Sequence, residues 1–158
     1  MIYGLLKTIH LLALMVWMGG MAFSLFFLRP AVGQLEAPER IRLMHDVLGR
    51  FFKAVLWAAG LTLLSGLWMI GRMAKAAVQS GGNFAMPLEW TVMAGLGIVM
   101  IAIFGHIRFA LYKRLTQAVT ATAWPAAGAA LDSIRLWVGI NLGLGVLIVA
   151  ITLIGLPG

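Results

Sequence analysis

Four long apolar stretches dominate this chain and decide what it can fold into. They cover residues 4–28, 52–72, 88–111 and 133–156, and a helix needs about 20 mostly apolar residues to cross a bilayer. Only 11% of the residues are charged, against about 25% in an average soluble domain. Because so few charges could not cover a soluble surface, the sequence predicts an all-α integral membrane protein, folded as an antiparallel four-helix bundle.

The residues between the stretches set the expected helix ends. Ala37-Pro38-Glu39 is typical of a helix start, because proline suits the first turn. The first stretch has no small-residue cleavage site after it and runs to Arg29-Pro30, so we expect a retained helix. Residues 79–87 read as a loop, and residues 116–132 as a weakly structured connector. We predict a single transmembrane domain of residues 1–158, with helices at about 4–28, 38–75, 88–114 and 131–156.

The basic residues divide unevenly between the two sides of the expected bundle. Nine lie on the side of the first and third loops, and three on the other (Lys7, Arg72 and Lys75). The positive-inside rule then predicts a protein of the bacterial inner membrane with both termini in the periplasm. The net charge of +7 is explained in this way, so we expect membrane lipid and no nucleic acid as a partner.

The residue types restrict the chemistry. The chain has no cysteine, which excludes disulfides, thiolate metal sites and iron–sulfur clusters. It has no serine beside a base and no pair of intramembrane carboxylates, so nothing favours hydrolysis. The remaining candidates are three histidines, ten methionines and a few intramembrane charges, and such charges are costly enough to suggest function.

His10 is the strongest of these candidates. It shares one helical stripe, which we expect to face the bundle interior, with Tyr3, Lys7, Leu14, Trp17 and Met21. Met93 and Met69 are the methionines expected at its depth, and imidazole with thioether can bind haem iron or cuprous copper. Lys7, one turn outward, could pair with a haem propionate or simply reach the interface. His10 could equally be a buried imidazole bonded to a neighbouring carbonyl or hydroxyl.

The other two histidines are weaker metal candidates. His106 lies near the opposite face of the membrane from His10, at a depth that differs by more than about 12 Å. The two therefore cannot ligate one metal centre. His45 is expected at or outside the interface.

Helix four carries features of close packing. Gly139 and Gly143 form a small-xxx-small pair, which favours packing within the bundle or in a homo-oligomer. Asn141 is expected to form a hydrogen bond across helices.

The first helix, Lys7-Thr-Ile-His10 followed by Trp17-Met-Gly19-Gly20, resembles that of the CopD-like copper-resistance membrane proteins. Gly49-Arg50-Phe51-Phe52 and Asn141-Leu142-Gly143 also agree with a small four-helix CopD-like group. The first helix is distantly similar to the HemJ-type protoporphyrinogen oxidases too, which implies haem b at His10. The third-helix lysine of that family falls on Met93 here. For CopD proteins the implied role is copper movement.

Three functions follow as hypotheses. The leading one is a b-type haem protein, with His10 and Met93 as iron ligands and Met69 in reserve, acting in redox or electron transfer near the periplasmic face. Such a protein could be a haem-dependent oxidoreductase with a quinone or another electron-transfer partner. The second is copper binding or copper transport through His10 and methionines. The third is a structural or assembly protein without a cofactor.

Overall fold

The computed structural model describes residues 2–83 and 85–154. Within these ranges there is no strand, and four helical segments are each long and apolar enough to cross a membrane. These segments are Ile2–Gln34, Ala37–Gln79, Leu88–Thr120 and Trp124–Ile154. The predicted all-α membrane bundle is confirmed, and the chain is a multi-pass membrane protein.

Two of the four segments contain a π-helical turn. The first segment consists of α1 (Ile2–Phe23), the π-helical η1 (Ser24–Leu28), α2 (Arg29–Ala31) and the 3-10 turn η2 (Val32–Gln34). The third consists of α4 (Leu88–His106), the π-helical η3 (Ile107–Leu111) and α5 (Tyr112–Thr120). The second and fourth segments are single helices, α3 (Ala37–Gln79) and α6 (Trp124–Ile154).

Helix α3 extends far beyond the bilayer core. Its 43 residues begin with Pro38 in the first turn, where a missing N–H costs nothing. At 1.5 Å per residue they span about 65 Å, roughly twice the thickness of the hydrocarbon core. The helix ends before Gly81, whose φ of 77° turns the chain toward α4.

The expected weakly structured connector at residues 116–132 is wrong. Helix α5 continues to Thr120 and α6 starts at Trp124, so that a short turn with Thr122 at a φ of 52° joins them. Pro125 does not break the helix because it occupies the first turn of α6, where its fixed φ is favourable. The alanines that follow are strong helix formers.

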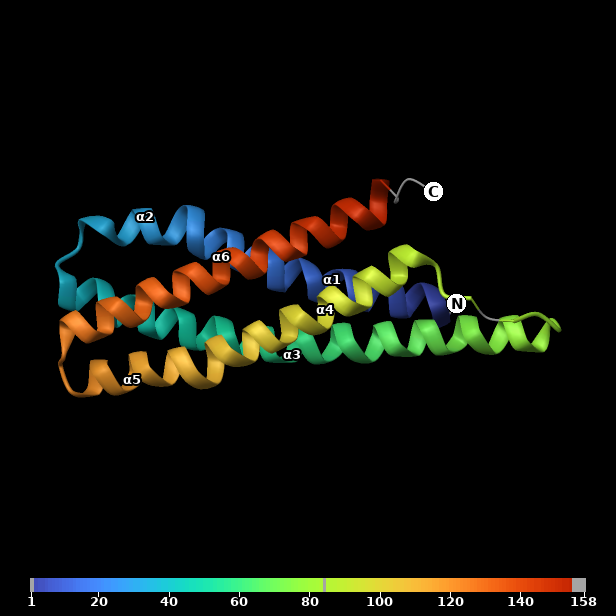
Figure 1. Ribbon diagram of the computed structural model, residues 1–158. Coiled ribbons are helices and arrows are strands. Elements are labelled where there is room, and N and C mark those ends of the chain that lie inside the picture. Colours follow the sequence, from blue (N-terminus) through green and yellow to red (C-terminus); the bar gives the residue numbers. More distant parts are fainter. Residues whose placement is uncertain (1, 84, 155–158) are drawn as a thin grey trace.

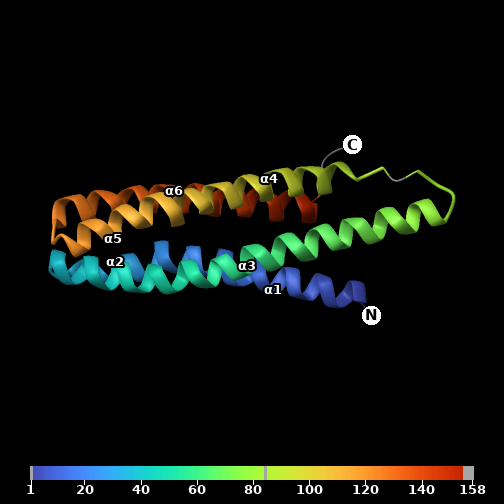
Figure 2. The same cartoon turned by 90° about the horizontal axis from the view of Figure 1, so that it is seen from below.

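The helices pack as two antiparallel pairs. Helix α1 lies along α3, and α4 with α5 lies along α6. Figure 2 shows the pairs as two layers, close together where α2 and α5 lie and separated where both chain termini lie. We call these the α5 end and the terminal end of the bundle; in Figure 1 they are at the left and the right.

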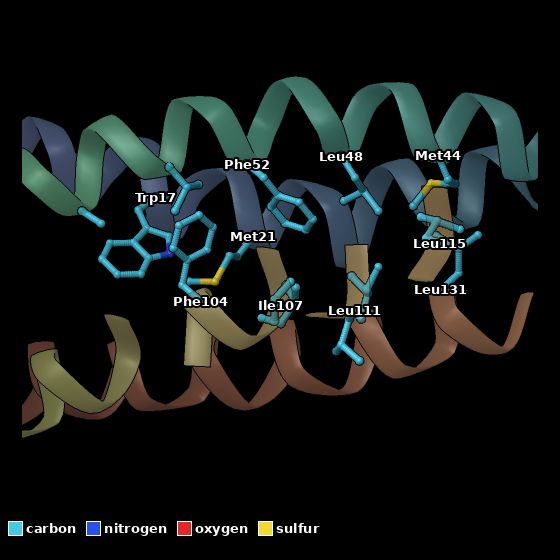
Figure 3. Packing of buried hydrophobic residues seen from close by; sticks show 14 of the residues in the cluster. Trp17, Met21, Met44, Leu48, Phe52, Phe104, Ile107, Leu111, Leu115 and Leu131 are labelled. Carbon is cyan, nitrogen blue, oxygen red and sulfur yellow. The ribbon is translucent and has the colours of Figure 1, made fainter. Parts of the chain in front are cut away.

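The hydrophobic core lies toward the α5 end. Helix α3 contributes Met44, Leu48 and Phe52, spaced by four residues so that they share one face. Figure 3 shows these side chains pointing from α3 toward those of the opposite layer. The buried partners from that layer are Phe104, Ile107, Leu111, Leu115 and Leu131. Trp17 and Met21 close the core on its α1 side.

The terminal end is much less filled. No residue is buried in residues 2–12, in residues 88–99 or in residues 146–154. The two helix pairs diverge there, and a cavity remains between them. The divergence also leaves Tyr3 and Lys7 exposed, whereas Trp17 and Met21 on the same stripe are buried.

Two expectations about α6 need correction. Asn141 does not bond across helices: it is 1% exposed, and neither its Nδ2 nor its Oδ1 has a hydrogen-bond partner among the described residues. Gly139 and Gly143 make no close packing contact in the described bundle, because a Cβ at either position would meet nothing within 4 Å. Their use in a homo-oligomer stays a prediction.

Candidate functional site

The open terminal end contains an apolar cavity between the two helix pairs. It has a volume of about 120 Å³ and lies between α1, α3 and α4, with Ile148 of α6 behind. His10, Thr62, Met93 and Met100 bring polar or sulfur atoms to it. The remaining wall is apolar: Leu14, Trp17, Leu63, Gly66, Leu67, Ile70, Ala94, Gly97, Ile98 and Ile101.

A hydrogen bond between the helices of one pair orients the His10 imidazole. Its Nδ1 lies 3.0 Å from the Oγ of Ser65 on α3. The Ser65 hydroxyl donates its one proton to the carbonyl of Leu61, a turn earlier. Its oxygen is therefore left to accept from Nδ1–H, and Nε2 is the nitrogen with the free lone pair. A metal-binding histidine is commonly held in this way through its second nitrogen.

Gly66 permits the imidazole to lie close to α3. A Cβ at this position would be 3.4 Å from Cε1 of His10 and 3.7 Å from Nδ1. A side chain larger than alanine would fill this side of the cavity. The pair Ser65-Gly66 thus supplies a hydrogen-bond acceptor and space at consecutive positions of α3.

Helix α4 presents two thioethers to the cavity. Met93 and Met100 are seven residues apart, or two turns, so they line it about 10 Å apart along the helix axis. Met100 is the one of the two that is buried, and it lies nearer the α5 end. Its Cε packs against Gly145 of α6, where an added Cβ would be only 3.2 Å away. The missing side chain of Gly145 also makes room for Met18.

A buried hydroxyl at the cavity has no hydrogen-bond partner among the described residues. Oγ1 of Thr62 is buried and forms no hydrogen bond within the described part of the chain. Buried hydroxyls usually find a partner, because leaving one unpaired costs about 1–3 kcal/mol. Thr62 is one turn before Ser65 and Gly66 on the face of α3 that meets the cavity.

The structure brings some of the predicted residues together and not others. His10, Trp17 and Met93 line the same cavity. Met69 is half-buried but does not line it, because its neighbour Ile70 occupies the α3 face that does. Lys7 is exposed and is not part of the wall.

His106 lies outside the cavity. It is exposed, and its ring meets the edge of Trp137 with centroids 5.3 Å apart.

His45 is also remote from the cavity. It stacks on Tyr112 at the α5 end, with ring centroids 5.2 Å apart. Its Nδ1 lies 3.2 Å from Oδ1 of Asp46, and its Nε2 3.1 Å from Oγ1 of Thr116.

The dimensions of the cavity favour a small ligand. Sites for drug-sized molecules and cofactors occupy about 300–1,000 Å³, whereas this cavity holds about 120 Å³. The residues present do not form a haem pocket, so the haem hypothesis finds no support here. The described residues also hold no group of three or more His, Cys, Asp or Glu side chains that could bind a metal. The ligand donors that line the cavity are one neutral imidazole and two thioethers.

Fold and cavity together define a multi-pass membrane protein whose bundle holds a His–Met cavity at its open end. A family model for copper resistance protein D matches residues 45–154, well over half of the chain. The chain therefore belongs to the CopD family. No curated protein and no solved structure matches the chain.

The matched range covers the cavity residues of α3 and α4 but not those of α1. It includes Thr62, Ser65, Met93 and Met100, but it begins after α1 and so leaves His10 outside. The match does not test the similarity of α1 to HemJ-type proteins, which stays a prediction.

The sequence reasoning missed several residues of the site. Met100 carried a usable signal, since it follows Met93 by two helical turns and so lies on the same face. Ser65, Gly66 and Thr62 carried none, because only the pairing of α3 with α1 brings them to His10.

Proposed function

We propose that this chain is a copper-handling membrane protein that binds cuprous ion in the cavity between His10 and the methionines of α4. The observation that carries this proposal is the shared wall: an imidazole with a free Nε2 and two thioethers line one small apolar cavity. Membership of the copper resistance protein D family supports copper as the metal.

The donor set suits Cu(I) better than harder ions. Thioether sulfur is a soft ligand and imidazole nitrogen is acceptable to copper, whereas Mg²⁺ and Ca²⁺ need carboxylate or carbonyl oxygen. Both donor types are neutral, so no anion has to be buried to form the site. A monovalent ion is also less costly to bring to membrane depth than a divalent one.

The packing argues for binding at the terminal end rather than an open path through the bundle. On the side of the cavity toward the α5 end, the rings of Trp17 and Phe104 pack edge to face, with centroids 5.9 Å apart. The rings of Phe104 and Phe52 pack in the same way, with centroids 6.1 Å apart. These rings belong to the close-packed core. Passage toward the α5 end would require this aromatic layer to rearrange, so we assign the cavity to metal capture.

The proposal is tested by titrating the purified, reduced protein with Cu(I) against a chromophoric chelator. We expect one tightly bound ion. His10→Ala and Met93→Leu should each weaken binding at least about tenfold, since even outer groups of metal sites typically contribute that much. Met15→Leu is the matched control, because Met15 lies on α1 but is 66% exposed.

Two results would overturn the proposal. Affinity that is equal in wild type, His10→Ala and Met93→Leu would place copper elsewhere or exclude it. A Soret band in the purified wild-type protein that disappears in His10→Ala would restore the haem hypothesis. Retained folding of each variant is checked by its thermal midpoint in detergent.

A further inference from the structure

A second cavity lies on the outside of the bundle, far from His10. It has a volume of about 290 Å³ and is formed between α3 and the third segment, where η3 meets α5. Its wall consists of Asp46, Gly49, Arg50, Lys53, Arg108 and Tyr112. We call it the basic pocket. It lies toward the α5 end and contributes nothing to the proposed copper site.

The close approach of Tyr112 to α3 builds one wall of the basic pocket. A Cβ at Gly49 would collide with the hydroxyl of Tyr112, so only glycine lets this ring lie across the helix. The hydroxyl donates to the carbonyl of His45 at 3.1 Å. The ring meets Phe52 at right angles, with centroids 5.5 Å apart. These contacts fix the phenol, and with it the shape of the pocket.

The charges of the basic pocket are unbalanced. Three of its side chains are cations and one is an acid, and Asp46 already accepts a hydrogen bond from His45. Among the described residues, none of the three cations forms a salt bridge. Arg108 instead lies over the rings of Tyr112 and Phe109, with its Cζ 5.3 Å and 5.7 Å from their centroids. The pocket thus offers unpaired donors to an anion.

The surroundings of the basic pocket match a membrane interface. Arg50 and Lys53 lie at the start of the apolar part of α3. Arg108 lies in η3, directly after the apolar helix α4. Trp57 follows Lys53 by one turn and is 77% exposed, and Phe109 beside Arg108 is 65% exposed. Aromatic side chains at this depth are typical of the boundary between headgroups and acyl chains. These surroundings suit an anion that carries an apolar tail.

We propose that the basic pocket binds the phosphate of an anionic phospholipid, with the acyl chains lying against Trp57 and Phe109. Arg50, Lys53 and Arg108 supply the charge, and the Arg108 guanidinium can bond two phosphate oxygens at once. Basic pockets between transmembrane helices bind anionic headgroups in this way. Arg108 lies in the π-helical η3, and such irregular turns often occur at functional sites.

The test measures how many molecules of dioleoylphosphatidylglycerol the purified protein retains in neutral detergent, by native mass spectrometry over a lipid titration. Dioleoylphosphatidylcholine, which has a phosphate but no net charge, and inorganic phosphate are titrated in parallel. We expect phosphatidylglycerol to bind, phosphatidylcholine to bind much more weakly, and inorganic phosphate not to displace the lipid at equal concentration.

A triple variant that combines Arg50→Gln, Lys53→Gln and Arg108→Gln removes the three cations of the basic pocket. Each cation near a membrane surface contributes about a fivefold effect, so the triple variant should lose about a hundredfold in phosphatidylglycerol affinity. All three side chains are at least partly exposed, so the variant should fold, which its thermal midpoint checks. The matched control removes three cations at the same end but outside the pocket, as Arg40→Gln, Lys113→Gln and Arg114→Gln.

Three results would overturn the proposal. The two triple variants could lose the same affinity, which would mean a general charge effect. Wild type could bind phosphatidylglycerol and phosphatidylcholine equally. Inorganic phosphate could bind in a way that depends on Arg108 while the lipid does not, and the ligand would then be a soluble phosphate.

Discussion

The imidazole of His10 depends on one hydroxyl for its orientation. The Ser65 hydroxyl donates to the carbonyl of Leu61 and can accept from Nδ1–H, which favours the tautomer with a free Nε2. Sequence reasoning could place His10 in the membrane because its neighbours are apolar. It could not find Ser65, since a serine 55 positions away comes into contact only through the pairing of α1 and α3.

Ser65→Ala should therefore affect both the fold and the metal site. The part-buried Nδ1–H loses the Ser65 oxygen as an acceptor, which should cost about 1 kcal/mol and lower the thermal midpoint. If the cavity binds copper, affinity should fall about tenfold, as is usual for a group that holds a metal ligand in place. Ser133→Ala is the control, because its hydroxyl bonds only to its own helix at Ala129. Equal behaviour of the two variants would show that the bond to His10 has no effect.

At the scale of the helices, some glycines lie where a side chain of another element approaches the helix backbone closely. Gly20 and Gly49 have an aromatic ring where their Cβ would lie, from Phe51 and Tyr112. This gives a structural reason for the Gly49-Arg50-Phe51-Phe52 stretch. Gly49 and Phe51 make the close approaches, Gly49 and Arg50 line the basic pocket, and Phe52 fills the core. Gly60 on the same helix has nothing within 4 Å of an added Cβ.

Gly49→Ala and Gly60→Ala should have opposite effects on stability. The first forces Tyr112 away from the carbonyl of His45 and should destabilise the protein by about 1–3 kcal/mol. The second meets no neighbour and should stabilise it by about 0.5–1 kcal/mol through higher helix propensity. Thermal unfolding in one detergent compares the two directly. A Gly49→Ala protein as stable as Gly60→Ala would mean that the Tyr112 contact is not needed.

In this membrane protein the sequence predicts where the helices are but not which of their faces point inward. Hydropathy predicted the four spans, because lipid imposes the same length on each. It could not predict which face of α4 or α6 is inside, since lipid-facing and bundle-facing residues are equally apolar. Depth alone therefore kept Met69 in reserve behind Met93, although of the two only Met93 lies on a face that meets the cavity.

At the scale of the whole molecule, the two ends of the bundle differ in packing. The core fills the α5 end, while the divergence of the two helix pairs opens the terminal end and leaves space beside His10. Which compartment the cavity faces then depends on the orientation of the entire bundle. Nine of the twelve basic residues are assigned to the α5 end, so the positive-inside rule predicts that this end is cytoplasmic and that the cavity faces the periplasm.

The absence of cysteine from the sequence makes this orientation directly testable. Asn83 is exposed in the loop between α3 and α4 at the terminal end, and Gln117 is exposed on α5. In intact cells, an impermeant maleimide should label Asn83→Cys and spare Gln117→Cys, because the reagent cannot cross the inner membrane. Opening the membrane should make both react, which controls for accessibility. Labelling of Gln117→Cys alone in intact cells would mean that the bundle has the opposite orientation and that the cavity at His10 faces the cytoplasm.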